Sequence, residues 1–141
     1  LDDFINQIKL NICSGGNSIP SIEGIIENNT ELIEYIKKAD LVVNTTPVGM
    51  ATVNKMNNYE IDMPLNAKIW DHLKKSATIY DLIYTPRPTK WLQNCKKITS
   101  NQIDGLEMLI HQGAASLRLW SGFTEIPIKI MREAALSHLN H

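Results

Sequence analysis

The chain has 141 residues, of which 43% are hydrophobic and 21% charged, as expected for about one globular domain. A net charge of −1 argues against nucleic acid as a partner, and no apolar run reaches the ~20 residues of a membrane span. Cys13 and Cys95 have neither CxxC spacing nor a nearby histidine pair, so the sequence predicts no metal site and no disulfide framework. Two isolated thiols without a recognisable signal peptide favour a cytoplasmic location.

Helix and strand patterns alternate along the chain. Residues 1–9 carry apolar side chains at helical spacing, and residues 30–39 predict a second helix. The run Leu41-Val42-Val43-Asn44 is β-branched without alternation, which predicts a parallel strand buried on both faces. Later expected elements are a helical turn at 69–73, strands at 78–82 and 97–99, and helices at 90–96, at 103–121 and after 124.

Capping residues mark the ends of three of these helices. Thr89 is expected to cap the helix at 90–96, and Gly122 to end the helix at 103–121. Thr124 is expected to cap the last helix, with Pro127 near its start. The alternation of strands and helices indicates an α/β fold with a parallel sheet, in which ligands bind beyond the carboxyl ends of the strands.

Two polar segments follow expected strands. Residues 44–50 combine Asn and Thr side chains with a glycine, so a flat polar cofactor could lie there; alternatively, the Asn and Thr side chains satisfy their own backbone. In residues 80–86, Tyr84 can donate to a substrate carboxylate or hydroxyl, or simply pack on a proline turn. Asp81 is expected to cap a turn rather than act as a base.

A third segment, residues 101–115, opens the longest expected helix. Asp104 and Gly105 stand at its start, where free N–H groups and a small residue favour the approach of a ligand. Gln112 follows Gly105 by about two turns and therefore shares its face, although it can equally be an ordinary polar residue. The small residues after Gln112, including Gly113, allow another element to pack closely.

In this order and spacing, the three segments resemble the shikimate dehydrogenase family. Residues 44–50 are similar to its NxTxxGM turn, residues 81–89 to its DxxYxPxxT segment, and residues 104–112 to its DGxxMLxxQ helix. The resemblance implies a partial Rossmann-like parallel sheet flanked by helices. Residues 1–102 would be the C-terminal part of the NADP-binding domain, and residues 103–141 a helical segment closing onto a substrate domain that the chain lacks.

The family's reaction is the reversible, NADPH-dependent reduction of 3-dehydroshikimate to shikimate, on the route to chorismate and the aromatic amino acids. The resemblance implies NADP as cofactor and shikimate or 3-dehydroshikimate as the small-molecule partner, and it allows for a homodimer of the full-length protein. The residues implied to contact the cofactor are Asn44, Thr45, Thr46, Leu82 and Gly105. The residues implied to bind the substrate are Tyr84 and Gln112.

Two features of the family have no match in this chain. One is the catalytic lysine with its aspartate; the other is the glycine-rich phosphate loop, because Gly15-Gly16 follows no buried strand. The resemblance therefore implies a C-terminal portion that is inactive alone, since acid–base chemistry needs a group within reach of the proton. The alternatives are a quinate/shikimate dehydrogenase paralogue, a non-catalytic ligand-binding remnant, and an unrelated Rossmann-type domain with chance matches.

Overall fold

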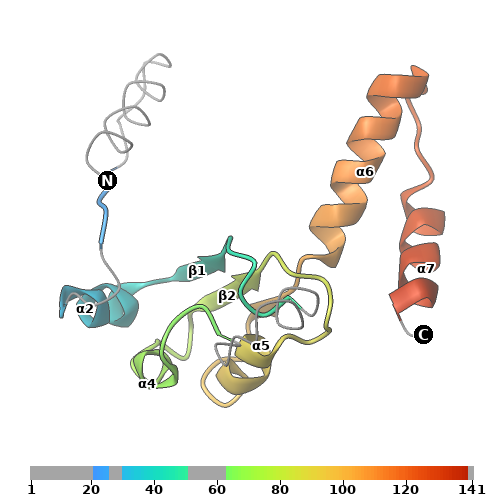
Figure 1. Cartoon of the computed structure of the whole chain (residues 1–141). Helices are drawn as coiled ribbons and strands as arrows, with labels where there is room; N and C mark the ends of the chain where they lie inside the picture. Colours follow the sequence, from blue (N-terminus) through green and yellow to red (C-terminus); the bar gives the residue numbers. More distant parts are fainter. Residues whose placement is uncertain (1–20, 26–29, 51–62, 140–141) are drawn as a thin grey trace. The chain divides into compact units, whose positions relative to one another are not determined.

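The computed structural model describes residues 21–25, 30–50 and 63–139 (Figure 1). The helix expected at residues 1–9 and the Gly15-Gly16 loop lie outside these ranges. The chain divides into two compact units, residues 1–35 and 36–141.

Helix α2 (Glu31–Lys38) confirms the helix expected at 30–39 and crosses the boundary between the two units. Its first turn is acidic and its last turn basic, an arrangement that complements the helix dipole. In the first unit, the phenol of Tyr35 donates a hydrogen bond to the carboxylate of Glu23, and this bond raises the pKa of Tyr35. The charges in the first and last turns of α2 therefore favour a helix over these residues.

Three short parallel strands form the sheet of the second unit, in the order β1-β2-β3. They are β1 (Leu41–Asn44), β2 (Thr78–Asp81) and β3 (Gln102–Ile103). The register places Asn44 beside Asp81, so the carboxyl ends of β1 and β2 lie at one edge of the sheet. The predicted α/β fold with a parallel sheet is confirmed.

Strand β1 is not buried on both faces, contrary to what its β-branched run predicts. Leu41 is 56% exposed and Val43 40% exposed, while Asn44 is buried. Within the described part of the chain, β1 pairs with β2 alone, so it stands at an edge of the sheet. Strand side chains point to the faces of a sheet, and Leu41 and Val43, two residues apart, share one face, so the described segments leave that face partly uncovered.

The strand predicted at 97–99 is wrong, because β3 begins at Gln102. The N–H groups of Ile98 and Thr99 instead bond to the carbonyl of Cys95, at 2.9 and 3.0 Å. The buried hydroxyl of Thr99 donates to the carbonyl of Ala77 at 2.8 Å. Residues 97–99 therefore close the end of a helix and anchor the turn that leads into β3.

After α2, the described part of the chain forms four more helices: α4 (Ala67–Trp70), α5 (Lys90–Cys95), α6 (Leu106–Ser121) and α7 (Ile128–Leu139). Thr89 caps α5 as predicted, its hydroxyl accepting from the N–H of Leu92 at 3.4 Å. Gly122 ends α6 in the left-handed conformation with φ of 74°, also as predicted. Helix α7 begins just after Pro127, so Thr124 lies too far upstream to cap it.

The core of the second unit centres on two tryptophans. Trp70 of α4 and Trp91 of α5 are buried, and their ring centroids lie 5.1 Å apart at a tilt of 48°. Such aromatic pairs add ~0.5–1.5 kcal/mol to the stabilisation from burial alone. Ile79 of β2 and Cys95 of α5 are fully buried, so sheet and helices share one core.

Helices α6 and α7 form a hairpin and run in opposite directions (Figure 1). Arg132 of α7 donates to both carboxylate oxygens of Glu107 in α6, each at 2.6 Å, and this contact lowers the pKa of Glu107. A Cβ on Gly113 would lie 3.2 Å from Cε of Met131, so the small residue admits α7 as expected. Within the described ranges, no helix has both the length and the apolar character to cross a bilayer.

The thiol of Cys95 should be unreactive in the folded chain. Burial, together with the charge of Asp71, raises its pKa to about 11, and the thiolate is the nucleophilic form. In a Cys13→Ser variant, which leaves Cys95 as the one thiol of the sequence, we expect Ellman's reagent to react ~100-fold more slowly under native conditions than in urea. Similar rates in both conditions would contradict the burial of Cys95.

Candidate functional site

The side chain of Asn44 fixes the turn that follows β1. Its Nδ2 donates to Oδ1 of Asp81 at 3.0 Å and to the carbonyl of Val48 at 3.3 Å. Its Oδ1 accepts from the N–H and the hydroxyl of Thr46, at 3.0 and 2.7 Å. An amide side chain has two donor hydrogens and two acceptor lone pairs, so these bonds use all of them. Asn44 therefore shapes the turn, while Thr45 and Thr46 are exposed to solvent.

The turn closes at Gly49. The N–H of Met50 donates to the carbonyl of Pro47 at 3.1 Å, and Gly49 has φ of 100°. That backbone conformation favours glycine, because an L side chain is strained there. Gly49 is buried, so the turn folds back onto the sheet edge and ends with Met50 beside the loop after β2.

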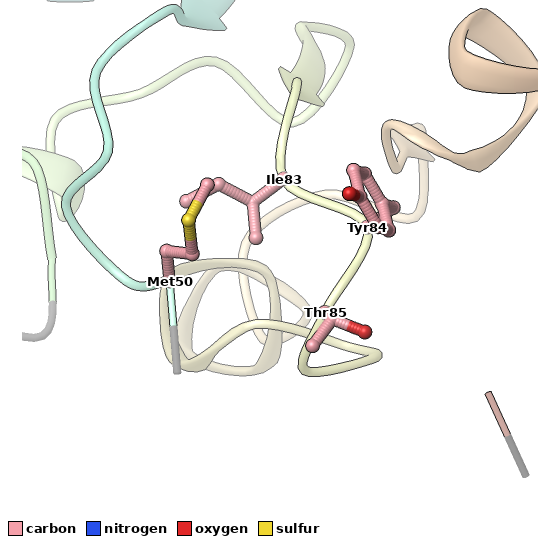
Figure 2. A pocket seen from close by; sticks show the side chains of 4 residues that line it. All are labelled: Met50, Ile83, Tyr84 and Thr85. Atoms are coloured by element: carbon pink, nitrogen blue, oxygen red, sulfur yellow. The ribbon is translucent and has the colours of Figure 1, made fainter. Parts of the chain in front are cut away.

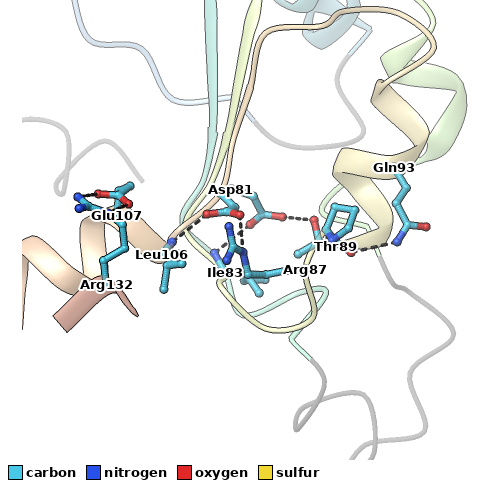
Figure 3. Close-up of polar contacts among 10 residues, drawn as sticks. Asp81, Ile83, Arg87, Thr89, Gln93, Leu106, Glu107 and Arg132 are labelled. Atoms are coloured by element: carbon cyan, nitrogen blue, oxygen red, sulfur yellow. Dashed lines mark hydrogen bonds and ion pairs between the residues drawn. The ribbon is translucent and has the colours of Figure 1, made fainter. Parts of the chain in front are cut away.

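Asp81, at the end of β2, accepts hydrogen bonds from three neighbours, two of which, Ile83 and Thr89, are labelled in Figure 3. Besides the amide of Asn44, its Oδ1 accepts from the N–H of Ile83 at 3.2 Å, and its Oδ2 accepts from the hydroxyl of Thr89 at 2.6 Å. The residue has no exposed surface. This confirms that Asp81 caps a turn, and its engaged carboxylate links the turn after β1 to the start of α5.

The loop after β2 meets the start of α6 through backbone contact. The N–H of Gly105 donates to the carbonyl of Ile83 at 3.1 Å. A Cβ on Gly105 would lie 1.9 Å from the carbonyl oxygen of Leu82, so no side chain fits there. The N–H of Leu82 in turn donates to the carbonyl of Asn44 at 3.1 Å. Three residues predicted to contact the cofactor, Asn44, Leu82 and Gly105, are thus neighbours.

Asp104 organises the start of α6. Its Oδ1 accepts from the N–H of Leu106 at 3.0 Å and so caps a helix end that Gly105 leaves without a side-chain cap. Its Oδ2 lies 2.7 Å from Nε of Arg87. This ion pair was not predicted from the sequence, because no local pattern relates an arginine between two prolines to an aspartate seventeen residues later.

A small pocket of about 110 Å³ opens beside these loops (Figure 2). Its lining is formed by Met50, Ile83, Tyr84 and Thr85. Figure 2 shows the side chains of Met50 and Ile83 facing each other, with the phenol of Tyr84 on the far side of the strand end. A cavity of ~150 Å³ can hold a benzene ring, so this smaller pocket has room for part of a flat six-membered ring.

Both expected substrate contacts, Tyr84 and Gln112, remain predictions. Tyr84 is 36% exposed at the pocket, and Gln112 is exposed on α6, two turns after Gly105. Their approach to a common ligand is a prediction from the resemblance. Among the described residues, no group of three His, Cys, Asp or Glu side chains is arranged to hold a metal ion.

A family model described as the shikimate 5′-dehydrogenase C-terminal domain matches residues 105–136, from the start of α6 into α7. The shikimate dehydrogenase (NADP(+)) of Prochlorococcus marinus subsp. pastoris is 38% identical over 139 residues. The match covers 99% of this chain and 45% of that relative. The chain therefore spans less than half of the relative's length.

Two solved structures show the same fold. Shikimate 5-dehydrogenase of Thermus thermophilus in complex with NADP(H) and shikimate has 31% identity and a TM-score of 0.58, covering 74% of this chain and 36% of that one. Quinate dehydrogenase of Corynebacterium glutamicum in complex with NAD has 30% identity and a TM-score of 0.59, covering 75% and 34%.

Gly105 should be intolerant of any side chain. In a Gly105→Ala variant the new methyl group would collide with rigid backbone at Leu82, and we expect a loss of ~2–3 kcal/mol or more in the free energy of unfolding. Gly113→Ala is the matched control, because its methyl meets only the flexible end of Met131, and we expect a change within ~1 kcal/mol. Equal losses in urea titrations of the two variants would contradict this packing.

The hydroxyl of Thr89 should stabilise the chain through both of its bonds. Thr89→Val keeps the shape but leaves Asp81 with one donor fewer and α5 without its cap, so we expect a loss of ~1–3 kcal/mol. Thr89→Ser retains the hydroxyl and should lose less than half as much. Chemical denaturation of both variants measures the difference, and a Val variant as stable as the Ser variant would refute the role.

Proposed function

Because the chain belongs to the shikimate dehydrogenase family, whose C-terminal part it matches, we propose that it forms that part of an NADP-dependent shikimate dehydrogenase. The reaction is the reversible reduction of 3-dehydroshikimate to shikimate in the cytoplasm, and the small-molecule partners are these two compounds. Under this proposal residues 1–102 complete a Rossmann-like NADP-binding domain, and residues 103–141 close onto a substrate domain.

The exposed apolar surface of the α6–α7 hairpin supports this division. None of the residues of α7 is buried, and most of its apolar positions are half-buried. Four large apolar side chains near the end of the hairpin are 64–83% exposed: Leu119, Trp120, Phe123 and Ile130. Such a patch favours contact with another part of a protein over permanent exposure to water.

The observation that carries the proposal is the backbone junction of Asn44, Leu82 and Gly105. These residues come from three separate segments, and hydrogen bonds of 3.1 Å link them in sequence: Leu82 to Asn44, and Gly105 to the residue after Leu82. In parallel α/β sheets this carboxyl edge is where cofactors bind. The same junction holds the residues that the family resemblance assigns to the nicotinamide.

The residues at this edge fit a nicotinamide ring. The pocket beside the junction is mostly apolar, Leu82 is half-buried, and Thr45 and Thr46 are exposed nearby on the turn. NADP(H), when bound, supplies the hydride acceptor or donor. Under the proposal, Leu82 packs on the ring, the backbone of Gly105 faces it, and the threonine turn offers polar contacts to the rest of the cofactor.

Substrate binding is assigned to Tyr84 and Gln112. A phenol and a carboxamide can both donate to the carboxylate and hydroxyl groups of shikimate, which are the groups that distinguish it from an apolar ring. Tyr84 stands at the rim of the pocket with about a third of its surface exposed, so a ligand can reach its hydroxyl. Gln112 follows Gly105 by about two turns of α6, and this spacing places both residues on one face of the helix.

A quinate dehydrogenase is the second candidate. The quinate dehydrogenase structure with NAD matches this chain with a TM-score of 0.59 and 30% identity, values close to those of the shikimate enzyme from Thermus. Quinate carries one more hydroxyl than shikimate and lacks the ring double bond. Comparing the affinity of the chain for the two acids distinguishes the candidates.

The chain alone should bind without turning over. In amide NMR titrations we expect millimolar shikimate to shift the signals of Tyr84 and Gln112. Tyr84→Phe should weaken this binding ~5–10-fold through the lost hydrogen bond. Tyr35→Phe, which alters an exposed tyrosine of the other unit, is the control.

With NADP and shikimate together, the purified chain should produce no NADPH absorbance, because no lysine matches the catalytic one of the family. Measurable turnover would overturn that expectation. Shikimate shifts that spare Tyr84 and Gln112, or binding of quinate alone, would overturn the assignment of the substrate site.

A further inference from the structure

We propose that the ion pair between Arg87 and Asp104 is a positioning contact that holds the loop carrying Tyr84 on the start of α6 and thereby sets the affinity for the substrate. The inference rests on the proposed function of Tyr84 as a substrate contact. It assigns a role to a pair of side chains that neither the motifs nor the comparisons single out.

The carboxylate of Asp104 serves two segments at once. One oxygen caps α6 by accepting from the N–H of Leu106 at 3.0 Å, and the other accepts from Nε of Arg87 at 2.7 Å. The direction of the Asp104 side chain is therefore fixed by the helix, and Arg87 meets a preset acceptor. A short, charge-assisted hydrogen bond to an acceptor that is already fixed restrains the loop more tightly than a bond between two mobile side chains would.

The ion pair completes the attachment of a loop whose two ends are already fixed. At the strand end, the carbonyl of Ile83 accepts from Gly105; at the helix end, Thr89 donates to Asp81. Between these points, Tyr84 and Thr85 line the pocket, and Arg87 is the charged residue that contacts α6. Without the pair, residues 84–88 would keep their end points but lose their central contact with α6.

The surroundings of the pair favour a measurable contribution to holding the loop on the start of α6. The side chains of Arg87 and Asp104 are 33% and 22% exposed, so water screens them less than it screens a fully exposed pair. Arg87 also stands between Pro86 and Pro88, whose rings restrict the backbone on both sides. Less backbone freedom is therefore lost there when the pair forms.

Two substitutions remove the pair and leave the helix cap in place. Arg87→Met keeps the aliphatic stem of the side chain and deletes its charge. Asp104→Asn deletes the opposite charge, while asparagine caps a helix about as well as aspartate. Arg87→Lys retains a positive charge that can pair with Asp104 and leaves the helix cap untouched, so it serves as the rescue variant. Arg118→Met, which removes another arginine that contacts backbone at the far end of α6, is the matched control.

Three readouts separate positioning from plain stability. We expect Arg87→Met and Asp104→Asn to weaken shikimate binding ~10-fold in amide NMR titrations, to leave NADP binding within about twofold, and to speed hydrogen exchange at the N–H of Gly105. Arg87→Lys should lose less than Arg87→Met, and Arg118→Met should change none of the three. Equal losses for shikimate and NADP that follow a lower melting temperature would reduce the pair to a structural role and overturn the inference.

The same experiments distinguish this inference from the function on which it rests. If shikimate shifts no signal of Tyr84 in the unmodified chain, the proposed substrate site fails. Hydrogen exchange at Gly105 still tests the contact without any ligand. Exchange that is faster in Arg87→Met and Asp104→Asn and closer to the unmodified rate in Arg87→Lys supports the attachment of the loop. Exchange that is unchanged in all of them overturns it.

Discussion

A buried carboxylate with three donors around it organises this part of the molecule. Asp81 ends β2 without exposed surface, and burying its polar side chain would be costly if its oxygens lacked partners. The amide of Asn44, the N–H of Ile83 and the hydroxyl of Thr89 supply those partners from three different segments. Satisfying one side chain thus fixes the turn after β1, the loop after β2 and the start of α5 together.

Local signals in the sequence predicted most of the elements, because the interactions that set them are local. Thr89 caps α5 and Gly122 ends α6 through contacts within one turn, so residue type and position suffice to recognise them. Two of the errors involve contacts between distant segments. The exposure of Val43 depends on which segment covers that face of the sheet, and the place of β3 depends on Thr99 reaching the carbonyl of Ala77.

The candidate site divides in the same way. The resemblance of the motifs identified Asn44, Leu82 and Gly105 as candidate site residues. The structure connects their segments through backbone hydrogen bonds, which the periodicity of the sequence does not predict. It also distinguishes roles that the motif treats alike: the amide of Asn44 is saturated by internal partners, whereas Thr45 and Thr46 face solvent. The pair of Arg87 and Asp104 escaped sequence reasoning because its register across the loop follows from folded geometry alone.

The open side of β1 has a consequence for assembly. Among the described residues β1 pairs with β2 alone, so the backbone groups on its other edge can bond to a further strand and extend the sheet. Leu41 and Val43 add exposed apolar surface on a face beside that edge. A segment that pairs there first blocks competitors. In concentrated solution, a second molecule presenting its own β1 becomes such a competitor, so self-association and correct completion of the sheet draw on the same few residues.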